Sequence, residues 1–173
     1  MCARLPMSLA VATSPPTLAA ERAEDAEAVE RLVFAAFGPG RYAKAAERLR
    51  EHGEAPLLDC SFVAWDGPQL VGCVRQWAVS VAGAPALLLG PIAVDPAYRR
   101  HGLGGALVER ACEAAAAAGH KLIVLVGDTP LFGPHGFAAA PRLVMPGPVD
   151  QRRVLAKALA SDAPPLEGPV AAA

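Results

Sequence analysis

The stretch that decides the fold is Val94-Asp95-Pro96-Ala97-Tyr98-Arg99-Arg100-His101-Gly102-Leu103-Gly104-Gly105-Ala106-Leu107. It follows an apolar run and opens the clearest helical pattern in the chain, so we interpret it as a strand end, a short loop and a helix start. Glycine has no Cβ, so Gly102, Gly104 and Gly105 let the backbone approach a ligand closely. A helix start also offers unpaired N–H groups and the positive end of a dipole. The stretch therefore predicts an anion site suited to a pyrophosphate.

Two features of the surroundings favour phosphate binding over a merely structural turn. The glycines alone are equally compatible with a tight connection between strand and helix. However, Arg99 and Arg100 stand just before them, and residues 96–108 contain no aspartate or glutamate. This charge pattern suits a bound phosphate group.

Two other phosphate-binding loops are excluded by their spacing. A P-loop ends in Gly-Lys-Ser or Gly-Lys-Thr, whereas this chain has Gly104-Gly105-Ala106. A dinucleotide fingerprint places its first glycine directly after the strand and its third glycine three positions past the second. Here residues 95–101 separate the strand from Gly102, and Leu107 stands at the third position.

The segments on both sides of the loop predict a β-α-β unit. Apolar residues recur every four positions over Leu103–Ala118, which is the pattern of an amphipathic helix. Apolar strands are predicted before it, over Ala86–Val94, and after it, over Lys121–Val126. Two core strands joined by a helix are expected to run parallel.

The rest of the chain predicts further elements around this unit. Upstream we expect a strand over Thr17–Glu21, a helix from Asp25 to Gly38, a second helix over about Tyr42–His52, and strands over Ser61–Trp65 and Leu70–Ser80. Asp66-Gly67 signals a hairpin turn, so the middle of the chain predicts an antiparallel meander. Downstream we expect a last helix over about Asp150–Leu159.

These elements predict one α+β domain with a mixed, mostly antiparallel sheet flanked by helices. At 173 residues the chain has the length of about one domain. We assign the domain to residues 15–160, with a loose N-terminal extension at residues 1–14 and a weakly ordered C-terminal tail at residues 161–173.

Composition excludes several classes of function. The formal net charge is −1, and a nucleic-acid binder would instead carry a basic face. No apolar run reaches membrane-spanning length, so we expect no membrane association and a cytoplasmic protein. The four histidines lack metal-ligand spacing and the four cysteines form no C-x-x-C pair, so we expect no metal site and reduced thiols.

The glycine loop and its flanks resemble a known family. The run Arg99-x-x-Gly102-x-Gly104, preceded by Leu89–Val94, resembles the acetyl-CoA motif of the GNAT acetyltransferases. The resemblance continues through Val126-Gly127-Asp128 and His135-Gly136-Phe137 and covers about residues 17–160. Further stretches are similar to a poorly characterised bacterial subgroup of predicted acetyltransferases. The resemblance implies a GNAT-type fold in which the β-α-β unit carries the glycine loop.

The resemblance also implies a binding mode for acetyl-CoA as cosubstrate. Backbone groups of Ile92 and Val94 would pair with the pantetheine arm, and the Ile92 amide would face the acetyl carbonyl. The cofactor-binding residues implied are Ile92, Ala93, Val94, Arg99, Arg100, His101, Gly102, Leu103, Gly104, Gly105 and Ala106. Among these, backbone N–H groups of residues 100–106 would hold the pyrophosphate, and either arginine side chain would add charge-assisted contacts. The implied activity is direct transfer of the acetyl group to an amine, with no covalent enzyme intermediate. Family members are often dimers, so the resemblance alone suggests a homodimer.

The family pattern breaks at the expected general acid. Many members have a tyrosine five residues before the phenylalanine of their Gly-Phe pair, where it protonates the departing thiolate. Here that position is Phe132, which has no proton to donate, and Gly133-Pro134 follow where a short helix would run. A coenzyme A thiol is acidic enough to leave with help from water, so the missing tyrosine is compatible with activity.

A general base is equally hard to identify. Asp128 follows a strand near the expected cleft, although an aspartate at such a position more often caps a turn. Cys73 is a second candidate near the thioester, but a packed core cysteine is the commoner case. Trp65 and Trp77 either line a substrate pocket or pack between sheet and helix.

Three functions therefore stand side by side. The first is an acetyl-CoA-dependent N-acetyltransferase acting on an amine of unknown identity. The second, motivated by Phe132 and the missing base, is a non-catalytic acyl-CoA sensor or partner-binding protein. The third is a nucleotide-binding regulator that uses the same glycine loop, which the failed spacings disfavour.

Overall fold

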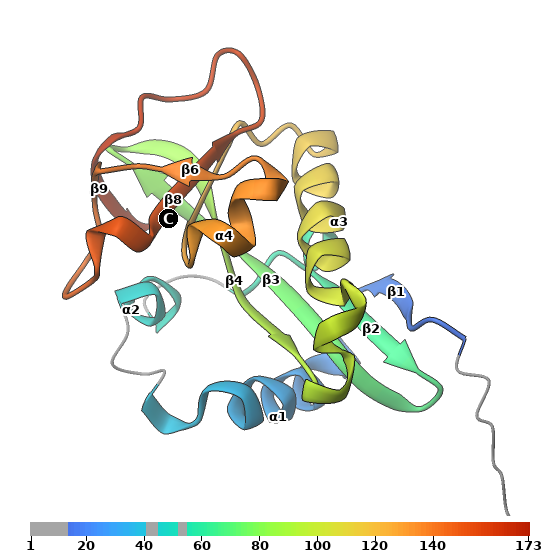
Figure 1. Ribbon diagram of the computed structural model, residues 1–173. Coiled ribbons are helices and arrows are strands. Elements are labelled where there is room, and N and C mark those ends of the chain that lie inside the picture. The colour runs from blue at the N-terminus through green and yellow to red at the C-terminus, as the bar shows by residue number, and fades with distance from the viewer. Residues whose placement is uncertain (1–13, 41–44, 52–54) are drawn as a thin grey trace, which may run out of the picture.

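The computed structural model describes residues 14–40, 45–51 and 55–173. The predicted N-terminal extension, apart from Ser14, and both ends of the helix predicted over Tyr42–His52 lie outside these ranges. The described strands form a mixed sheet in the order β1-β2-β3-β4-β5-β8-β6, with β9 pairing β3 and β7 (Figure 1). This arrangement confirms the predicted α+β class.

The predicted meander and β-α-β unit are both present. Antiparallel pairing joins β1 (Thr17–Ala20), β2 (Phe62–Asp66), β3 (Gln69–Val81) and β4 (Ala84–Val94) in chain order. Strand β4 then leads through a 3-10 turn (Pro96–His101) and α3 (Leu103–Ala117) to β5 (Leu122–Val126), which pairs with β4 in parallel.

Helices cover both faces of the sheet. Alternate residues of β4 point to opposite faces: Leu87 and Leu89 pack with α3, whereas Ala86 and Leu88 belong to the core on the other side. On that second side lie α1 (Ala26–Phe37) and α2 (Ala45–Glu51), and Figure 1 shows them well separated from α3. Because both faces are covered, the central strands are apolar almost throughout.

The predicted helix over Asp150–Leu159 is wrong. The chain instead forms a short 3-10 turn (Gln151–Arg153) followed by the strand β8 (Val154–Ala158). Strand β8 pairs antiparallel with all five residues of β5 and buries Leu155 on the α3 side and Val154 and Ala156 on the other side. This pairing decides the structure, because tertiary contacts override the helix propensity of a short segment.

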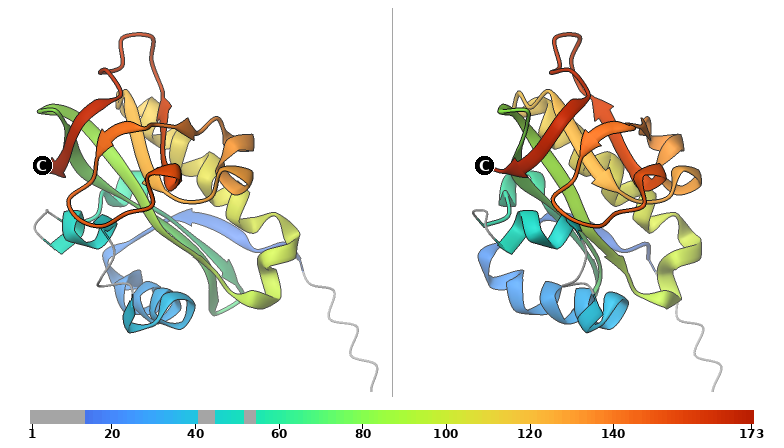
Figure 2. Two further views of the ribbon diagram at one scale, coloured as in Figure 1. Left: turned by 60° about the vertical axis from the view of Figure 1, so that its left-hand side comes forward. Right: turned by 90° about the vertical axis from the view of Figure 1, so that its left-hand side faces the viewer.

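The expectation of a weakly ordered tail is also wrong. Residues Glu167–Ala172 form β9, which pairs antiparallel with the end of β3 and parallel with β7 (Arg142–Val144). Figure 2 shows this terminal strand lying beside β3. Val170 is buried in the core around Leu88, which gives β9 an apolar anchor. The remaining short strand, β6 (Ala138–Ala139), pairs with β8.

A buried ion cluster ties the N-terminal segment to the sheet. The Arg75 guanidinium donates from Nε to both carboxylate oxygens of Glu21, at 3.0 Å each, and from Nη1 to Glu30 of α1. Arg75 is 5% exposed and Glu21 is 1% exposed. A buried charge needs such a partner, because water no longer stabilises it.

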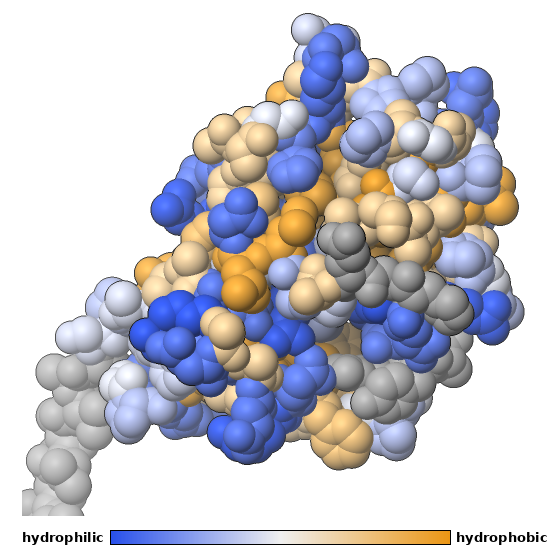
Figure 3. Space-filling model, turned by 180° about the vertical axis from the view of Figure 1, so that it is seen from behind, coloured by the Kyte–Doolittle hydropathy of each residue, from blue (hydrophilic) through white to orange (hydrophobic). Residues whose placement is uncertain are grey.

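The outer surface is mixed in character. On the face opposite to that of Figure 1, apolar side chains gather into a central patch bordered by polar ones (Figure 3). Within the described ranges no helix combines the length and the apolarity needed to cross a bilayer. Those same ranges hold no group of three or more histidine, cysteine, aspartate or glutamate side chains placed to bind a metal ion.

Candidate active site

The site lies where β4 and β5 separate. The two strands pair at Leu87 with Ile123 and at Leu88 with Val124. Beyond these positions β4 continues to Val94, and within residues 55–173 it makes no further pair with β5. Backbone groups on this side of β4 are therefore available to a ligand that lies along the strand as an added strand would.

An irregularity in β4 falls in the same place. The register with β3 shifts so that Val74 faces Ile92 but Gln76 faces Leu89, which leaves Gly90-Pro91 opposite Arg75. The peptide bond between Gly90 and Pro91 is cis, and Gly90 has a φ of 127°. The Trp77 indole donates to the Gly90 carbonyl at 2.8 Å and so holds the bulge from the neighbouring strand. Bulges of this kind redirect the groups next to a site.

A first cavity, which we term the glycine-loop cavity, lies between β4, the start of α3 and the segment after β5. Its volume is about 260 Å³. It is lined by Ile92, Val94, Arg99, Gly104, Gly105, Val108, Leu131, Phe132 and His135.

The first turn of α3 contributes directly to this cavity. Gly102, at a φ of 72°, precedes the helix, and its carbonyl accepts the first intrahelical bond from the Ala106 N–H at 3.0 Å. The N–H groups of residues 103–105 therefore have no acceptor inside the helix. Since Gly104 and Gly105 line the cavity, these donors and the helix dipole favour an anion there.

Two side chains border the helix start. Arg99 donates from Nε to the Val94 carbonyl at 3.0 Å, which holds its guanidinium beside the cavity. His135 lies against Gly105, where an added Cβ would be 3.0 Å from the ring Cε1. The other side of that ring, Nδ1, is 3.1 Å from a Glu109 carboxylate oxygen. The absence of a side chain at Gly105 is thus what allows the imidazole to approach the helix.

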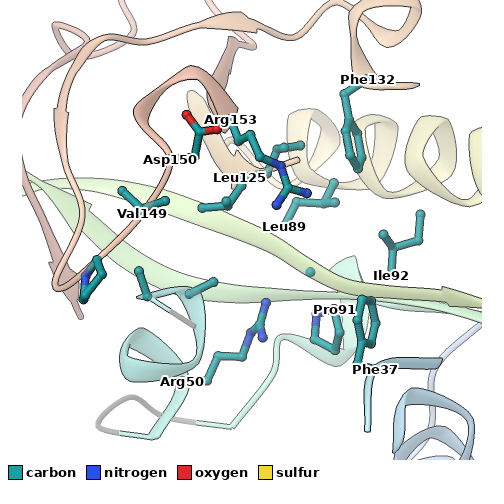
Figure 4. A pocket seen from close by; sticks show the side chains of 15 residues that line it. Phe37, Arg50, Leu89, Pro91, Ile92, Leu125, Phe132, Val149, Asp150 and Arg153 are labelled. Atoms are coloured by element: carbon teal, nitrogen blue, oxygen red, sulfur yellow. The ribbon is translucent and has the colours of Figure 1, made fainter. Parts of the chain in front are cut away.

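A second cavity, the α2 cavity, opens on the other side of the diverging strands and has a volume of about 280 Å³. Its described lining consists of Phe37, Ala45, Ala46, Arg50, Leu89, Gly90, Pro91, Ile92, Leu125, Val126, Phe132, Pro148, Val149, Asp150 and Arg153. Figure 4 shows Arg50 and Arg153 reaching toward each other from opposite walls.

Ile92 and Phe132 line both cavities and so mark their junction. Phe132 ends the short helix α4 (Thr129–Phe132), after which the chain continues as a 3-10 turn (Gly133–His135). The short helix therefore forms, and Gly133-Pro134 lie just beyond it. The Phe132 ring is 5% exposed and packs edge-on against Phe137, with ring centroids 6.0 Å apart. A hydrocarbon ring thus occupies the junction.

The structure brings together five of the predicted site residues, all at the glycine-loop cavity: Ile92, Val94, Arg99, Gly104 and Gly105. The others line neither described cavity: Ala93, Arg100, His101, Gly102, Leu103, Ala106 and Asp128. Ala93 faces α1, and Leu103 is part of the core under α3.

The candidate bases lie away from the junction. The exposed Asp128 carboxylate accepts a hydrogen bond from Arg153 Nε at 2.9 Å. Cys73 is fully buried, and this burial raises the pKa of its thiol to about 12. It therefore stays protonated at neutral pH and acts as a core residue.

Sequence reasoning missed Arg50, Arg153 and His135 as cavity residues. His135 lies in the His-Gly-Phe run that carried part of the family resemblance, so that motif was a signal for it. The two arginines carry no local signal, because their convergence depends on how α2 and β8 pack.

Comparison with known proteins gives these cavities a context. The sequence pattern of the acetyltransferase (GNAT) family matches residues 25–137. The chain belongs to the GNAT acetyltransferase family. It is 33% identical over 119 residues to the uncharacterized N-acetyltransferase YhbS of Escherichia coli. The aligned region covers 67% of this GNAT chain and 70% of YhbS.

Two solved GNAT structures are similar over most of their length. One is YhbS from Escherichia coli in complex with CoA, with a TM-score of 0.77 and 29% identity, covering 92% of this chain and 90% of that one. The other is a GNAT family acetyltransferase from Brucella melitensis in complex with acetyl-CoA, with a TM-score of 0.69 and 28% identity, covering 90% and 94%.

Proposed function

We propose that this GNAT protein transfers the acetyl group of acetyl-CoA to a small amine. The observation that carries the proposal is the pair of cavities that meet at Ile92 and Phe132. One cavity has a helix start suited to an anion, and the other is a separate pocket for an acceptor. A transferase needs this arrangement, because its two substrates must meet at one point.

The glycine-loop cavity suits coenzyme A. Backbone N–H groups around the start of α3 would bind the pyrophosphate, with Arg99 adding a charge-assisted contact. The pantetheine arm carries amides and would lie along β4 between Val94 and Ile92, where β5 has diverged. The CoA and acetyl-CoA complexes of the two related proteins support this assignment.

The chemistry then takes place at the junction. Bound acetyl-CoA supplies an acetyl group activated as a thioester. The amine nitrogen attacks the carbonyl carbon, the carbonyl oxygen gains negative charge, and the C–S bond breaks to release the thiolate. A fixed N–H from Ile92 would stabilise that oxygen. The nitrogen would lose its extra proton to water, and, because Phe132 has no proton to give, water would also supply the proton that converts the thiolate to the free thiol. Asp128 has no part in this proposal, because it is bonded to Arg153 and lines neither cavity.

Thermal unfolding of the purified protein with acetyl-CoA, coenzyme A, ATP and NAD in parallel tests the cofactor half. A ligand at a hundred times its Kd stabilises the fold by about 2.7 kcal/mol. For a domain of this length the midpoint should rise by roughly 5–11 °C. Shifts with acetyl-CoA and coenzyme A alone support the proposal, and no shift up to millimolar concentration contradicts it.

Release of free thiol from acetyl-CoA across a broad amine panel tests the transfer half. The rate should exceed the protein-free rate for at least one amine class. The packed hydrocarbon ring of Phe132 favours a second candidate, a non-catalytic acyl-CoA sensor. Binding of coenzyme A without thiol release for any amine would support the sensor and reject the transferase.

A further inference from the structure

Two guanidinium groups face one another in the α2 cavity. Arg50 approaches from α2 and Arg153 from the segment before β8, and Figure 4 shows both directed toward the space between the walls. From this pair we propose that the acceptor is a small primary amine that also carries an anionic group, either a carboxylate or a phosphate. This inference rests on the proposed function, because it names the substrate of the same site.

The position of Arg50 brings this charge close to the reacting centre. A Cβ added to Gly90 would lie 3.0 Å from Arg50 Nη2, so the guanidinium adjoins the bulge in β4. Gly90 is two residues from Ile92, whose amide we assign to the acetyl carbonyl. An acceptor whose anionic group binds Arg50 would therefore place an amine near the thioester if only a few bonds separate the two groups. Amino acids and short aminoalkyl phosphates meet that condition.

The described lining of the cavity contains two guanidinium groups and one carboxylate. Glu47 is 2.9 Å from Arg50 and Asp128 is 2.9 Å from Arg153, and neither carboxylate belongs to this described lining. Asp150 does line the cavity, but both of its carboxylate oxygens are bonded to Arg152. Guanidinium groups that face a partly closed site favour carboxylate or phosphate, because they donate two parallel hydrogen bonds.

Most of the remaining lining is apolar and comes from Phe37, Leu89, Leu125, Val126 and Val149. Small-molecule sites typically combine such walls with a few polar groups that set orientation. The volume of about 280 Å³ is slightly below their usual range of about 300–1,000 Å³. The acceptor should thus be a compact molecule.

Matched amines provide the test. Thiol release from acetyl-CoA should be measured with several amino acids, each compared with its amide and with its decarboxylated amine. Phosphoethanolamine and ethanolamine form a parallel pair that separates phosphate from carboxylate. The anionic member of at least one series should have a kcat/KM at least tenfold above its neutral partners.

Variants then assign the preference to the two arginines. Arg50→Gln and Arg153→Gln should each raise KM for the anionic amine at least tenfold, while the thermal shift given by coenzyme A stays the same. Arg50→Lys keeps the charge and should retain part of the preference, which separates loss of charge from loss of fold. Arg142→Gln is the control, since Arg142 is exposed on β7 and lines neither cavity.

The outcomes separate this inference from the proposed function. Thiol release that is equally fast with neutral amines overturns the anionic acceptor and leaves the transferase standing. If no amine releases thiol, the transferase fails, and thermal shifts by the same amines in the presence of coenzyme A decide the inference. A shift by anionic amines that Arg50→Gln abolishes supports it, and the absence of any shift overturns it.

Discussion

A Cβ on Gly127 would lie 2.3 Å from Cε2 of Phe132, so the glycine at the end of β5 creates the space that the phenylalanine ring occupies. The Gly127 N–H also donates to the Arg153 carbonyl at 2.8 Å. One residue thus positions both the ring at the junction of the two cavities and the segment that carries an arginine of the α2 cavity.

Gly127→Ala should destabilise the protein by about 1–3 kcal/mol, because the added methyl forces the Phe132 ring to move. Urea unfolding measures this loss directly. Gly133→Ala is the matched control: its Cβ would meet only Thr129 Cγ2, at an ordinary 3.7 Å. An equal loss in both variants would show that the ring contact is not the cause.

Phe132→Tyr should increase the rate of thiol release. The ring lies at the junction, so a hydroxyl there would provide the thiolate with a proton donor. General acid catalysis contributes about 10²–10⁴-fold, and we expect kcat to rise at least about tenfold with KM for acetyl-CoA little changed. Steady-state kinetics on both proteins measures the effect.

Phe137→Tyr adds the same hydroxyl to the neighbouring ring, which lines neither cavity, and should give no increase. An unchanged kcat in Phe132→Tyr would mean that the proton reaches the thiolate by another route.

Gly104→Ala should weaken the binding of coenzyme A without lowering the stability of the free protein. The new Cβ would lie 3.7 Å from Val94 Cγ2. This is an ordinary van der Waals contact, so the fold accommodates the methyl group. Alanine is the better helix former by about 0.5–1 kcal/mol, so the free protein should be equally or more stable. The methyl would nevertheless occupy part of the glycine-loop cavity, so the thermal shift given by coenzyme A should fall by more than half. An undiminished shift would place the cofactor elsewhere.

The sequence predicts the elements whose burial pattern is local. The helix over Leu103–Ala118 and the strands around it have strong periodicity, and the structure reproduces them within about two residues. The segments that were mispredicted, β8 and β9, form strands because partners distant in the chain pair with them. Short apolar segments of this kind do not distinguish helix from strand without those partners.

The candidate site also has one part that could be predicted from the sequence and another that could not. Glycines and a helix start make an anion site that is readable from adjacent residues, so the loop around Gly104 was visible in the sequence. The described lining of the α2 cavity comes from six separate segments, and its two arginines, Arg50 and Arg153, are about a hundred positions apart in the chain. Only the packing of the sheet shows that these two side chains face one site.

The buried cluster around Arg75 should be essential to stability. Arg75→Met leaves Glu21 buried and without its guanidinium, and breaking such a pair costs about 3–5 kcal/mol. Arg31→Ala, which breaks an exposed pair with Glu27, should cost at most about 1 kcal/mol. Chemical denaturation compares the two. A partial recovery in Glu21→Gln combined with Arg75→Met would show that the uncompensated charge, rather than lost packing, causes the defect.

Cys73 should make the stability fall at alkaline pH. Burial raises the pKa of its thiol from an ordinary 9.0 to about 12 in the folded protein. Above pH 9 the unfolded chain loses this proton while the folded chain keeps it, so the free energy of unfolding decreases as pH rises. One thiol contributes a slope of up to about 1.4 kcal/mol per pH unit. Cys73→Ala should therefore show a shallower decline in the free energy of unfolding between pH 9 and 10.5 in urea unfolding experiments.

Cys60 and Cys112 also have raised thiol pKa values, so the free energy of unfolding of this variant still decreases with pH. Parallel curves for the two proteins would mean that the Cys73 thiol ionises without cost in the fold.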